Sequence, residues 1–318
     1  MPLSWLFYAV VTVRKFLYQT GVLKSFSLPV PVIVVGNINV GGTGKTPLVV
    51  YLVEQLQAIG LNPGVISRGY GANTLTVRAV KATDAASQVG DEPLLLKQRL
   101  GCPVYVHPNR VLAGQKLLEE NPECDIIISD DGLQHYRLQR AFEIVVVDAQ
   151  IGFGNGALLP AGSLREPISR LKSVDAIVTN GIYVGSYAFS RQHGNKTYEM
   201  QLQAEKFYNL QNSNLRCEAK DFFEKKIFAI AGIGNPGRFF YQLEKMGLRF
   251  KHCSFSDHHA FDPQDFAKIR ADVLLMTEKD AVKCLSFAQS NFWVLPVSAM
   301  LDEAFLMCLF HKLASIDD

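Results

Sequence analysis

Residues 32–56, VIVVGNINVGGTGKTPLVVYLVEQL, constrain the fold more than any other part of the chain. An apolar run, a glycine-rich loop and an amphipathic run follow one another directly, which predicts a strand, a phosphate-binding loop and a helix. Gly41, Gly42 and Gly44 let backbone N–H groups turn inward around a phosphate, and the helix points its positive end at the same place. The segment therefore predicts a P-loop nucleotide-binding fold.

Within this loop, Lys45 is expected to reach the β- and γ-phosphates of a nucleotide and Thr46 to ligate Mg²⁺. The usual pattern begins with glycine, and this chain has Asn39 there. We expect Asn39 to replace that glycine because asparagine tolerates left-handed backbone better than most residues. A glycine-rich turn that merely joins a strand to a helix is the alternative. The expected nucleotide-binding residues are Asn39, Val40, Gly41, Gly42, Thr43, Gly44, Lys45 and Thr46.

Composition excludes several classes of protein. The chain has 318 residues, 48% of them hydrophobic, and a formal net charge of +2, which gives no case for a nucleic-acid surface. The six cysteines include no C-x-x-C pair, so neither a disulfide framework nor a zinc site is expected.

The first residues, MPLSWLFYAVVTVRKFLYQTGVL, are apolar and aromatic but are interrupted by Arg14 and Lys15. The run is too short and too charged for a spanning helix, and its basic residues follow the apolar run instead of preceding it as in a signal peptide. We expect a helix at the membrane interface whose cations face anionic headgroups. A helix packed on the domain or on a partner subunit is the alternative.

Apolar β-branched runs alternate with helical patterns along most of the chain, which predicts a P-loop NTPase-like parallel sheet covered by helices on both faces, with a second, smaller α/β lobe. Strands are expected at 30–36, 63–69, 102–107, 125–129, 143–148, 175–180, 226–232, 273–277 and 292–297, and helices at 45–59, 91–100, 108–120 and 236–247. The expected domains are a membrane-associated helix (1–28), the P-loop core (29–184), a linker or small antiparallel insert (185–225) and a C-terminal α/β lobe (226–318).

Charged motifs follow several of these strands, where ligands bind in an open parallel sheet. In CDIIISDDGLQHYR, Asp130 and Asp131 end an apolar strand, as in a Walker B motif whose carboxylate holds Mg²⁺. The loop continues with Gln134 and His135, and a solvated turn is the alternative. Glu166, in PAGSLREP, is expected either in a salt-bridged turn or at the metal. The expected metal ligands are Thr46, Asp130, Asp131, Gln134 and Glu166.

Two further motifs leave their chemistry open. Asp91, in VGDEPLLL, precedes a predicted helix, and from the residues alone an N-cap is the better interpretation. FSDHHAFD offers Asp257, His258, His259 and Asp262, which suit either a metal or a proton relay.

Taken together, the motifs resemble the tetraacyldisaccharide 4′-kinase family of lipid A biosynthesis, from the N-terminal helix to about residue 285. They occur in the family's order: GNINVGGTGKTP, SRGYG, GDEP, SDDGLQH, LREP, GIGNPGRFF, DHHAF and TEKDAVK. The family also carries a residue other than glycine at the position of Asn39.

The resemblance implies transfer of the ATP γ-phosphate, with Mg²⁺, to the 4′-hydroxyl of a tetraacylated glucosamine disaccharide 1-phosphate at the cytoplasmic face of the inner membrane. It assigns a catalytic couple to Asp91 and His258, which overrides the N-cap interpretation. We also expect a monomer that binds this lipid, with substrate contacts from Arg68, Tyr70, Arg110, His135 and Arg165.

Other readings of the P-loop remain. A membrane-associated ATPase switch uses a loop with an additional lysine, where this chain has Val40. A phosphoesterase with an Asp-His-His motif has no use for a P-loop, and a nucleotide-gated scaffold would lack transfer chemistry.

Overall fold

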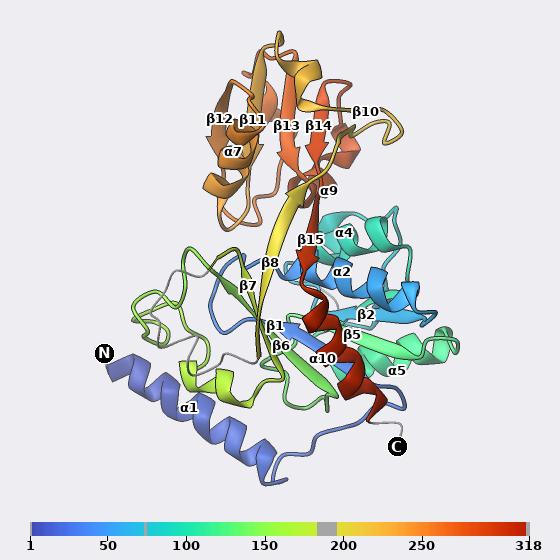
Figure 1. The fold of residues 1–318 in the computed structure, drawn as a ribbon, viewed down its shortest axis with the longest axis vertical. Coiled ribbons are helices and arrows are strands. Elements are labelled where there is room, and N and C mark those ends of the chain that lie inside the picture. Colours follow the sequence, from blue (N-terminus) through green and yellow to red (C-terminus); the bar gives the residue numbers. More distant parts are fainter. Residues whose placement is uncertain (1, 73–74, 183–195, 316–318) are drawn as a thin grey trace.

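The computed structural model describes residues 2–72, 75–182 and 196–315, which form two lobes around separate β-sheets (Figure 1). The larger sheet has nine strands in the order β15-β8-β7-β6-β1-β5-β2-β4-β3, and the smaller has six in the order β10-β9-β14-β13-β11-β12. From β7 to β4 the larger sheet is parallel. The expected α/β fold with a large, mostly parallel sheet is therefore confirmed.

Each strand expected from the sequence has a counterpart. In the larger sheet these are β1 (Val32–Gly36), β2 (Pro63–Ser67), β4 (Val104–Val106), β5 (Ile126–Asp130), β6 (Phe142–Asp148) and β7 (Ala176–Asn180). In the smaller sheet they are β11 (Ile227–Ala231), β13 (Val273–Thr277) and β14 (Phe292–Leu295). The strands β8 (Thr197–Ala204), β9 (Phe207–Asn209) and β10 (Arg216–Cys217) lie in the segment expected to be a linker or a small antiparallel insert. The strands β3 (Arg78–Ala79), β12 (Phe250–Ser254) and β15 (Val297–Leu301) were not expected.

Helices cover both faces of the larger sheet because side chains along each strand point alternately to opposite sides. Ile33 and Val35 of β1 pack in the core beneath α2 (Lys45–Ala58), α4 (Asp91–Leu100) and α10 (Glu303–Ala314). Val32 and Val34 face the other side, under α5 (Arg110–Glu120). The helices expected at 45–59, 91–100 and 108–120 are confirmed as α2, α4 and α5.

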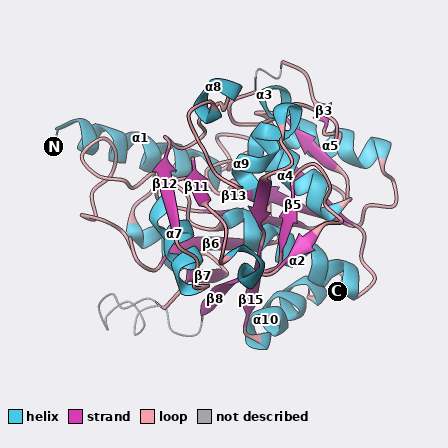
Figure 2. Cartoon of the chain, turned by 90° about the horizontal axis from the view of Figure 1, so that it is seen from above, coloured by secondary structure: helices cyan, strands magenta, loops and turns pink. Residues whose placement is uncertain are grey.

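The smaller lobe packs α7 (Pro236–Lys245), the helix expected at 236–247, against its own core. Figure 2 shows this lobe from above, with α7, α8 and α9 around its strands. The remaining helical segments of the two lobes are α3 (Ala86–Val89), α8 (Pro263–Phe266), α9 (Glu278–Cys284) and the 3₁₀ turns η1 (Ile168–Ser173), η3 (Ala219–Phe222) and η4 (Leu285–Phe287).

Two antiparallel strands join the lobes. β8 leaves the larger sheet toward the smaller lobe, and β15 returns beside it with Val297 opposite Ala204 (Figure 1). The chain then ends in α10 on the larger lobe, whereas the sequence placed all of 226–318 in the C-terminal lobe. β9 and β10, from the expected linker or insert at 185–225, belong to the smaller sheet, and residues 183–195 lie outside the described part. The expected domain limits stay a prediction.

Helix α1 (Pro2–Gln19) lies along one side of the larger lobe. Ser4 is buried and its hydroxyl oxygen accepts a hydrogen bond from the Ala161 N–H at 3.1 Å, while Phe7 packs on a core cluster of this lobe. Seven large apolar side chains of the helix remain exposed, namely Leu3, Trp5, Leu6, Tyr8, Val10, Val13 and Phe16. Within the described residues, none of the helices has the length and hydropathy needed to cross a bilayer.

The return of the chain to the larger lobe predicts a matched pair of effects in α10. Phe305 has 0% exposure in the core of the larger lobe and Met307, two residues on, is 71% exposed. Phe305→Ala should lower the free energy of unfolding by about 3–5 kcal/mol because it leaves a cavity, while Met307→Ala should change it by less than about 0.5 kcal/mol. Urea denaturation measures both. Equal effects would contradict the placement of α10.

Candidate functional site

The P-loop lies between β1 and α2, and close neighbours require glycine at its last position before the helix, Gly44. Gly44 precedes α2 with φ 96°, and a Cβ there would lie 2.5 Å from the Asn180 side-chain nitrogen. That nitrogen donates a hydrogen bond to the Thr43 carbonyl at 3.1 Å, so the neighbouring strand β7 supports the loop directly. Lys45, the first residue of α2, is 8% exposed, and its Nζ lies 3.5 Å from Asp131 Oδ1.

Asn39 replaces the usual glycine in a different way from the one expected. The expectation of left-handed backbone is wrong: among the described residues other than glycine, only Asp131 and His258 have positive φ. Asn39 instead pairs with Leu164 in an isolated β-bridge, and its side-chain nitrogen donates to the Gly152 carbonyl at 2.7 Å. The asparagine thus anchors the start of the loop to the segment that follows β6.

Asp130 and Asp131 stand at the end of β5, next to the P-loop strand. Asp130 is 0% exposed and accepts a hydrogen bond from the Ser67 hydroxyl at 3.2 Å. Burial, with the charges of Glu92 and Asp131, raises the pKa of Asp130 to about 7. For Asp131, burial opposes ionisation, but the charges of Lys45 and Arg165 outweigh it and lower the pKa.

This end of β5 fits a divalent cation. Oδ1 of Asp130 has no hydrogen-bond partner in the described part of the chain, and a cation beside it would favour the carboxylate form. The described residues contain no group of three or more His, Cys, Asp or Glu side chains that could hold a metal by itself. Mg²⁺ typically binds one or two carboxylates together with substrate phosphates and water, which agrees with such a sparse donor set.

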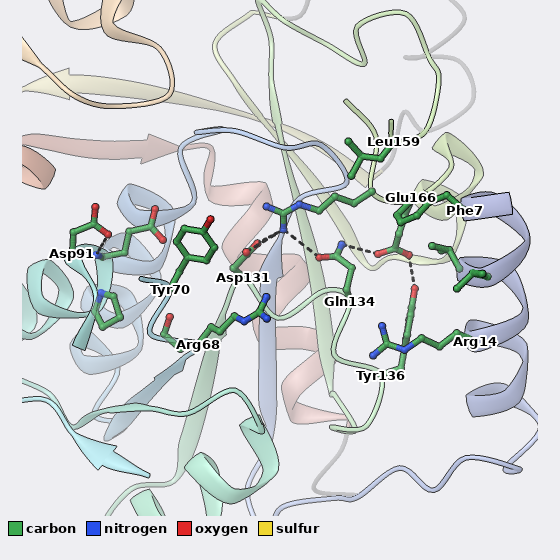
Figure 3. Close-up of a pocket in the computed structure, with 16 residues that line it drawn as sticks. Phe7, Arg14, Arg68, Tyr70, Asp91, Asp131, Gln134, Tyr136, Leu159 and Glu166 are labelled. Atoms are coloured by element: carbon green, nitrogen blue, oxygen red, sulfur yellow. Dashed lines mark hydrogen bonds and ion pairs between the residues drawn. The ribbon is translucent and has the colours of Figure 1, made fainter. Parts of the chain in front are cut away.

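A chain of polar contacts leads from Asp131 toward α1 (Figure 3). Arg165 is ion-paired with Asp131 at 3.1 Å, and Gln134 donates to Glu166 Oε1 at 2.8 Å. Glu166 also accepts a hydrogen bond from the Tyr136 hydroxyl and is ion-paired with Arg170 at 3.2 Å. Glu166 would have to give up these contacts to reach a metal, so its metal role, like that of Gln134, stays a prediction.

The five expected substrate residues fall into two groups. Arg68, Tyr70 and Arg165 line a cavity of about 420 Å³, whereas Arg110 and His135 are not among its lining residues. Arg110 is buried behind the Asp130–Asp131 turn and donates to the Asp131 carbonyl at 3.2 Å, and burial lowers its pKa to about 10. Burial, helped by Arg110 and Arg140, lowers the pKa of His135 to about 4, so this imidazole is neutral.

The 420 Å³ cavity extends from Asp91 to Phe7 and Arg14 of α1 (Figure 3). A second cavity, of about 600 Å³, lies between the lobes and is lined by the P-loop from Gly42 to Thr46. Apolar and polar residues of the second lobe complete its wall. Glu92 lines both cavities, so they share a wall at the residue next to Asp91, and Asp91 itself lines the smaller one.

Asp91 and His258 come together across the lobes, 167 residues apart in the chain, with Nδ1 of His258 2.9 Å from Asp91 Oδ2. The N-cap interpretation of Asp91 is wrong, because Gly90 occupies the cap position and Asp91 is the first residue of α4. Burial opposes ionisation of Asp91, but the hydrogen bond with His258 and the charge of Lys279 lower its pKa overall. The hydrogen bond to Asp91 raises the pKa of His258.

Two ion pairs between the lobes hold this couple in place. Lys279 of α9 contacts Glu92 at 3.1 Å and Asp257 at 3.3 Å, and its Nζ lies 3.5 Å from His258 Nε2. An ammonium group at Nε2 favours the tautomer that carries its proton on Nδ1, facing Asp91. The neighbouring Glu278 is ion-paired with Arg99 of α4 at 2.8 Å.

Most of these supporting residues were missed from the sequence. TEKDAVK was noted as a motif, but nothing in it shows that Glu278 and Lys279 reach α4. His258 has φ 58°, an uncommon backbone conformation for a residue other than glycine and one that often marks a functional site. Chemically, the arrangement offers a phosphate loop, a carboxylate for a cation and a second carboxylate oriented by histidine.

Comparisons with known proteins found relatives over nearly the whole chain. The family model for tetraacyldisaccharide-1-P 4′-kinase matches residues 1–314. Proteins named tetraacyldisaccharide 4′-kinase from Methylobacillus flagellatus and Pasteurella multocida are 48% and 49% identical, covering 99% and 94% of this chain and 91% and 89% of their own lengths. A crystal structure of LpxK from Aquifex aeolicus, described as an apo form in complex with ATP, superposes with a TM-score of 0.80 at 28% identity over 98% of both chains.

The contact between Asp91 and His258 predicts a change that NMR can measure. Asp91→Asn removes the charge that favours the imidazolium but keeps the shape of the side chain. Because burial and Lys279 both lower the pKa of His258, that pKa should fall below the wild-type value in the variant. Asp265→Asn, which changes the partner of His259 instead, should leave the His258 titration unaltered. An unchanged His258 pKa in Asp91→Asn would refute the contact.

Proposed function

Because the chain belongs to the tetraacyldisaccharide-1-P 4′-kinase family, we infer that it transfers the γ-phosphate of ATP to the 4′-hydroxyl of a tetraacylated glucosamine disaccharide 1-phosphate. This reaction belongs to lipid A biosynthesis. The family match favours it over a membrane-associated ATPase switch, which would need no lipid acceptor.

We place ATP in the 600 Å³ cavity between the lobes. The backbone of residues 41–44 would surround the phosphates, and Lys45 would contact the β- and γ-phosphates. Thr46, Asp130 and Asp131 are the residues we propose to hold Mg²⁺, which when bound neutralises charge on the phosphates. Lys45 lies 3.5 Å from Asp131, so the cation site and the phosphate grip are adjacent.

The lipid acceptor would occupy the 420 Å³ cavity. Three arginines surround this space, Arg14, Arg68 and Arg165, and they suit a sugar phosphate, which carries anionic oxygens. Phe7, Val10 and Val11 of α1 line the cavity from the other side, and they suit the beginning of acyl chains. Tyr70, whose ring centroid lies 5.0 Å from that of His258, would contact the sugar near the reacting hydroxyl.

Asp91 is the group we propose as general base. Its lowered pKa keeps it ionised at neutral pH, and one carboxylate oxygen is oriented by His258 while the carboxylate remains beside the acceptor cavity. The carboxylate would accept the proton of the 4′-hydroxyl as the oxygen attacks the γ-phosphorus. His258 orients the carboxylate through their hydrogen bond and takes part in the change of charge when Asp91 accepts the proton.

A single observation carries this assignment: Glu92 is a wall residue of both cavities, and Asp91, its neighbour in the chain, lines the proposed acceptor cavity. A kinase must bring a phosphate donor and an acceptor hydroxyl together next to a base. An ATPase switch needs the nucleotide cavity alone.

We further propose that α1 lies on a membrane surface at the cytoplasmic face of the inner membrane. Its buried side, with Ser4 and Phe7, contacts the protein, and its apolar side, with Trp5, Val13 and Phe16, is exposed. An exposed apolar strip of this kind suits the headgroup and acyl-chain boundary. Lys15 is half-buried, so it lies partly toward the protein and not wholly toward headgroups as expected; this burial and the charge of Arg170 lower its pKa.

The direct test of the proposed function is ATP consumption by purified protein with and without the detergent-solubilised disaccharide. We expect turnover that depends on the acceptor and a product phosphorylated at the 4′ position, detected by mass spectrometry. Lys45→Ala should abolish most of it because a charged contact to the phosphates is lost. Equal ATP hydrolysis with and without acceptor would favour the ATPase switch.

Changes at Asp91 test the assignment of the base. Asp91→Asn should lower kcat by about 10²–10⁴-fold with little change in ATP affinity, because proton acceptance is lost while the nucleotide grip remains. His258→Ala should have a similar effect, and the double variant should be little worse than either single one. Steady-state kinetics on folded protein measures these values.

His259→Ala is the matched control for the histidine, since His259 pairs with Asp265 and not with Asp91. Its kcat should stay within about threefold of the wild-type value, as expected for a side chain outside the proposed base couple. Wild-type activity in Asp91→Asn would contradict the proposed base and leave Asp91 with a structural role only.

The membrane proposal predicts a loss of vesicle binding on changing the exposed side of α1. Trp5→Glu combined with Phe16→Glu should weaken cosedimentation with phosphatidylglycerol vesicles by about tenfold or more, because buried apolar area is lost. Met307→Glu, an equally exposed position on α10, is the control and should bind as the wild type does. Equal binding by all three proteins would contradict the proposal.

A further inference from the structure

The second lobe places an arginine at the wall of the nucleotide cavity. Arg238 belongs to the first turn of α7 and lines the same space as Gly42, Lys45 and Thr46. The turn is fixed locally, because the Asn235 side chain accepts a hydrogen bond from the Arg238 N–H at 3.3 Å and proline occupies the start of the helix.

The loop before α7 lies directly on the P-loop. A Cβ on Gly234 would come within 2.6 Å of the Gly42 backbone nitrogen, so a larger residue has no space there. The same loop is tied to its own lobe by a hydrogen bond from the Gly232 N–H to Asp280 at 3.0 Å. Arg238 is therefore positioned by a contact with the backbone that would surround the phosphates.

In this structure Arg238 is ion-paired with Asp148, at the end of β6, with Nη2 and Oδ1 3.0 Å apart. That same oxygen accepts hydrogen bonds from the backbone N–H groups of Gln150 and Ile151, so the turn after β6 holds Asp148 without the arginine. Asp148 is 2% exposed, whereas the Arg238 side chain is 26% exposed. The carboxylate is thus held by the turn as well as by the arginine, and the guanidinium is the more exposed partner.

A guanidinium at this place can exchange a carboxylate for a phosphate, since its planar set of donors matches both groups. While phosphates are absent, Asp148 keeps the guanidinium of Arg238 at the cavity. The backbone N–H groups of Gln150 and Ile151 still pair with the carboxylate when the arginine leaves it. When ATP is bound, the phosphates carry more negative charge than one carboxylate and compete for the arginine.

We propose that Arg238 is a catalytic residue supplied by the second lobe, which leaves Asp148 to contact the β- and γ-phosphates during transfer. This inference rests on the proposed function. In the step concerned, the acceptor oxygen forms a bond to the γ-phosphorus and the bond from that phosphorus to the β–γ bridging oxygen breaks. The proton passes to Asp91, and the electron pair stays on ADP. Arg238 stabilises the negative charge that builds on the phosphate oxygens.

The competing explanation is that Arg238 and Asp148 only join the lobes. The two accounts differ for Asp148→Asn, which keeps the oxygen for the turn but removes the competing charge. A simple joint between the lobes would make this variant resemble Arg238→Ala. Under the proposed role the two variants change triphosphate affinity in opposite directions, because Asp148→Asn releases the arginine to bind phosphate.

The test combines kinetics with calorimetric titration of a non-hydrolysable ATP analogue and Mg²⁺. Arg238→Ala should lower kcat by at least about 10²-fold and weaken binding of the triphosphate more than that of ADP. Arg238→Lys should recover little of kcat because it lacks the planar set of donors. Asp148→Asn should tighten triphosphate binding by roughly two- to fivefold. Arg270→Ala, a second-lobe arginine that contacts the Ala267 carbonyl, is the control and should match the wild type.

Arg238→Gln replaces Arg238→Ala if the latter does not fold. The inference is overturned if the arginine variant keeps kcat within about threefold of the wild type, or if Asp148→Asn weakens triphosphate binding as Arg238→Ala does. The titrations need no acceptor, so they separate this failure from failure of the proposed function. If the wild type and Lys45→Ala bind the analogue equally poorly, the P-loop assignment fails instead.

Discussion

The hydrogen bond between His258 and Asp91 is the interaction on which the site depends, because it joins groups from two lobes that have separate cores. Neither lobe contains the couple by itself. The ion pairs of Lys279 with Glu92 and of Glu278 with Arg99 bring α9 against α4, and His258 then meets the first turn of that helix. The geometry of the proposed base therefore depends on how the lobes are packed together.

This dependence would give the smaller lobe a part in the proposed chemistry as well as in binding. One of its loops carries His258, which contacts Asp91 at the proposed acceptor cavity, and another loop packs Gly234 against the P-loop. The first contact is a hydrogen bond between two side chains, and the second is a backbone approach with no space for a Cβ, so both restrict how the lobes can pack. The antiparallel strands β8 and β15 link the lobes. A change in the relative position of the two lobes would therefore alter the His258 contact and the Gly234 contact together.

The P-loop core was predictable because its signals are local. An apolar strand, a glycine loop and Lys45 in direct succession leave few alternatives, and each expected strand was found. The crossing strands were not predictable, since the pairing of β8 with β15 joins segments about a hundred residues apart and the return of α10 to the larger lobe has no local signature.

The site residues also divide into those with a local sequence signal and those whose partners lie far away in the chain. The residues alone favoured a helix cap for Asp91, because a carboxylate next to Gly90 looks the same whether its partner is a backbone N–H or a distant histidine. The family resemblance corrected that interpretation, and the structure supplies the contact. For Asn39 the residue type suggested a backbone conformation, but the replacement of glycine works through a side-chain bond to Gly152, which no local pattern predicts.

The central claim is that the Asp91 carboxylate, oriented by His258 of the other lobe, binds the 4′-hydroxyl of the acceptor and accepts its proton. The most direct test is a crystal structure of the protein with a non-hydrolysable ATP analogue, Mg²⁺ and the tetraacylated disaccharide. The account predicts the 4′-hydroxyl oxygen within about 2.6–3.2 Å of an Asp91 carboxylate oxygen, with His258 still bonded to the other. A 4′-hydroxyl bound to Asp131, with Asp91 facing away from the acceptor, would contradict it.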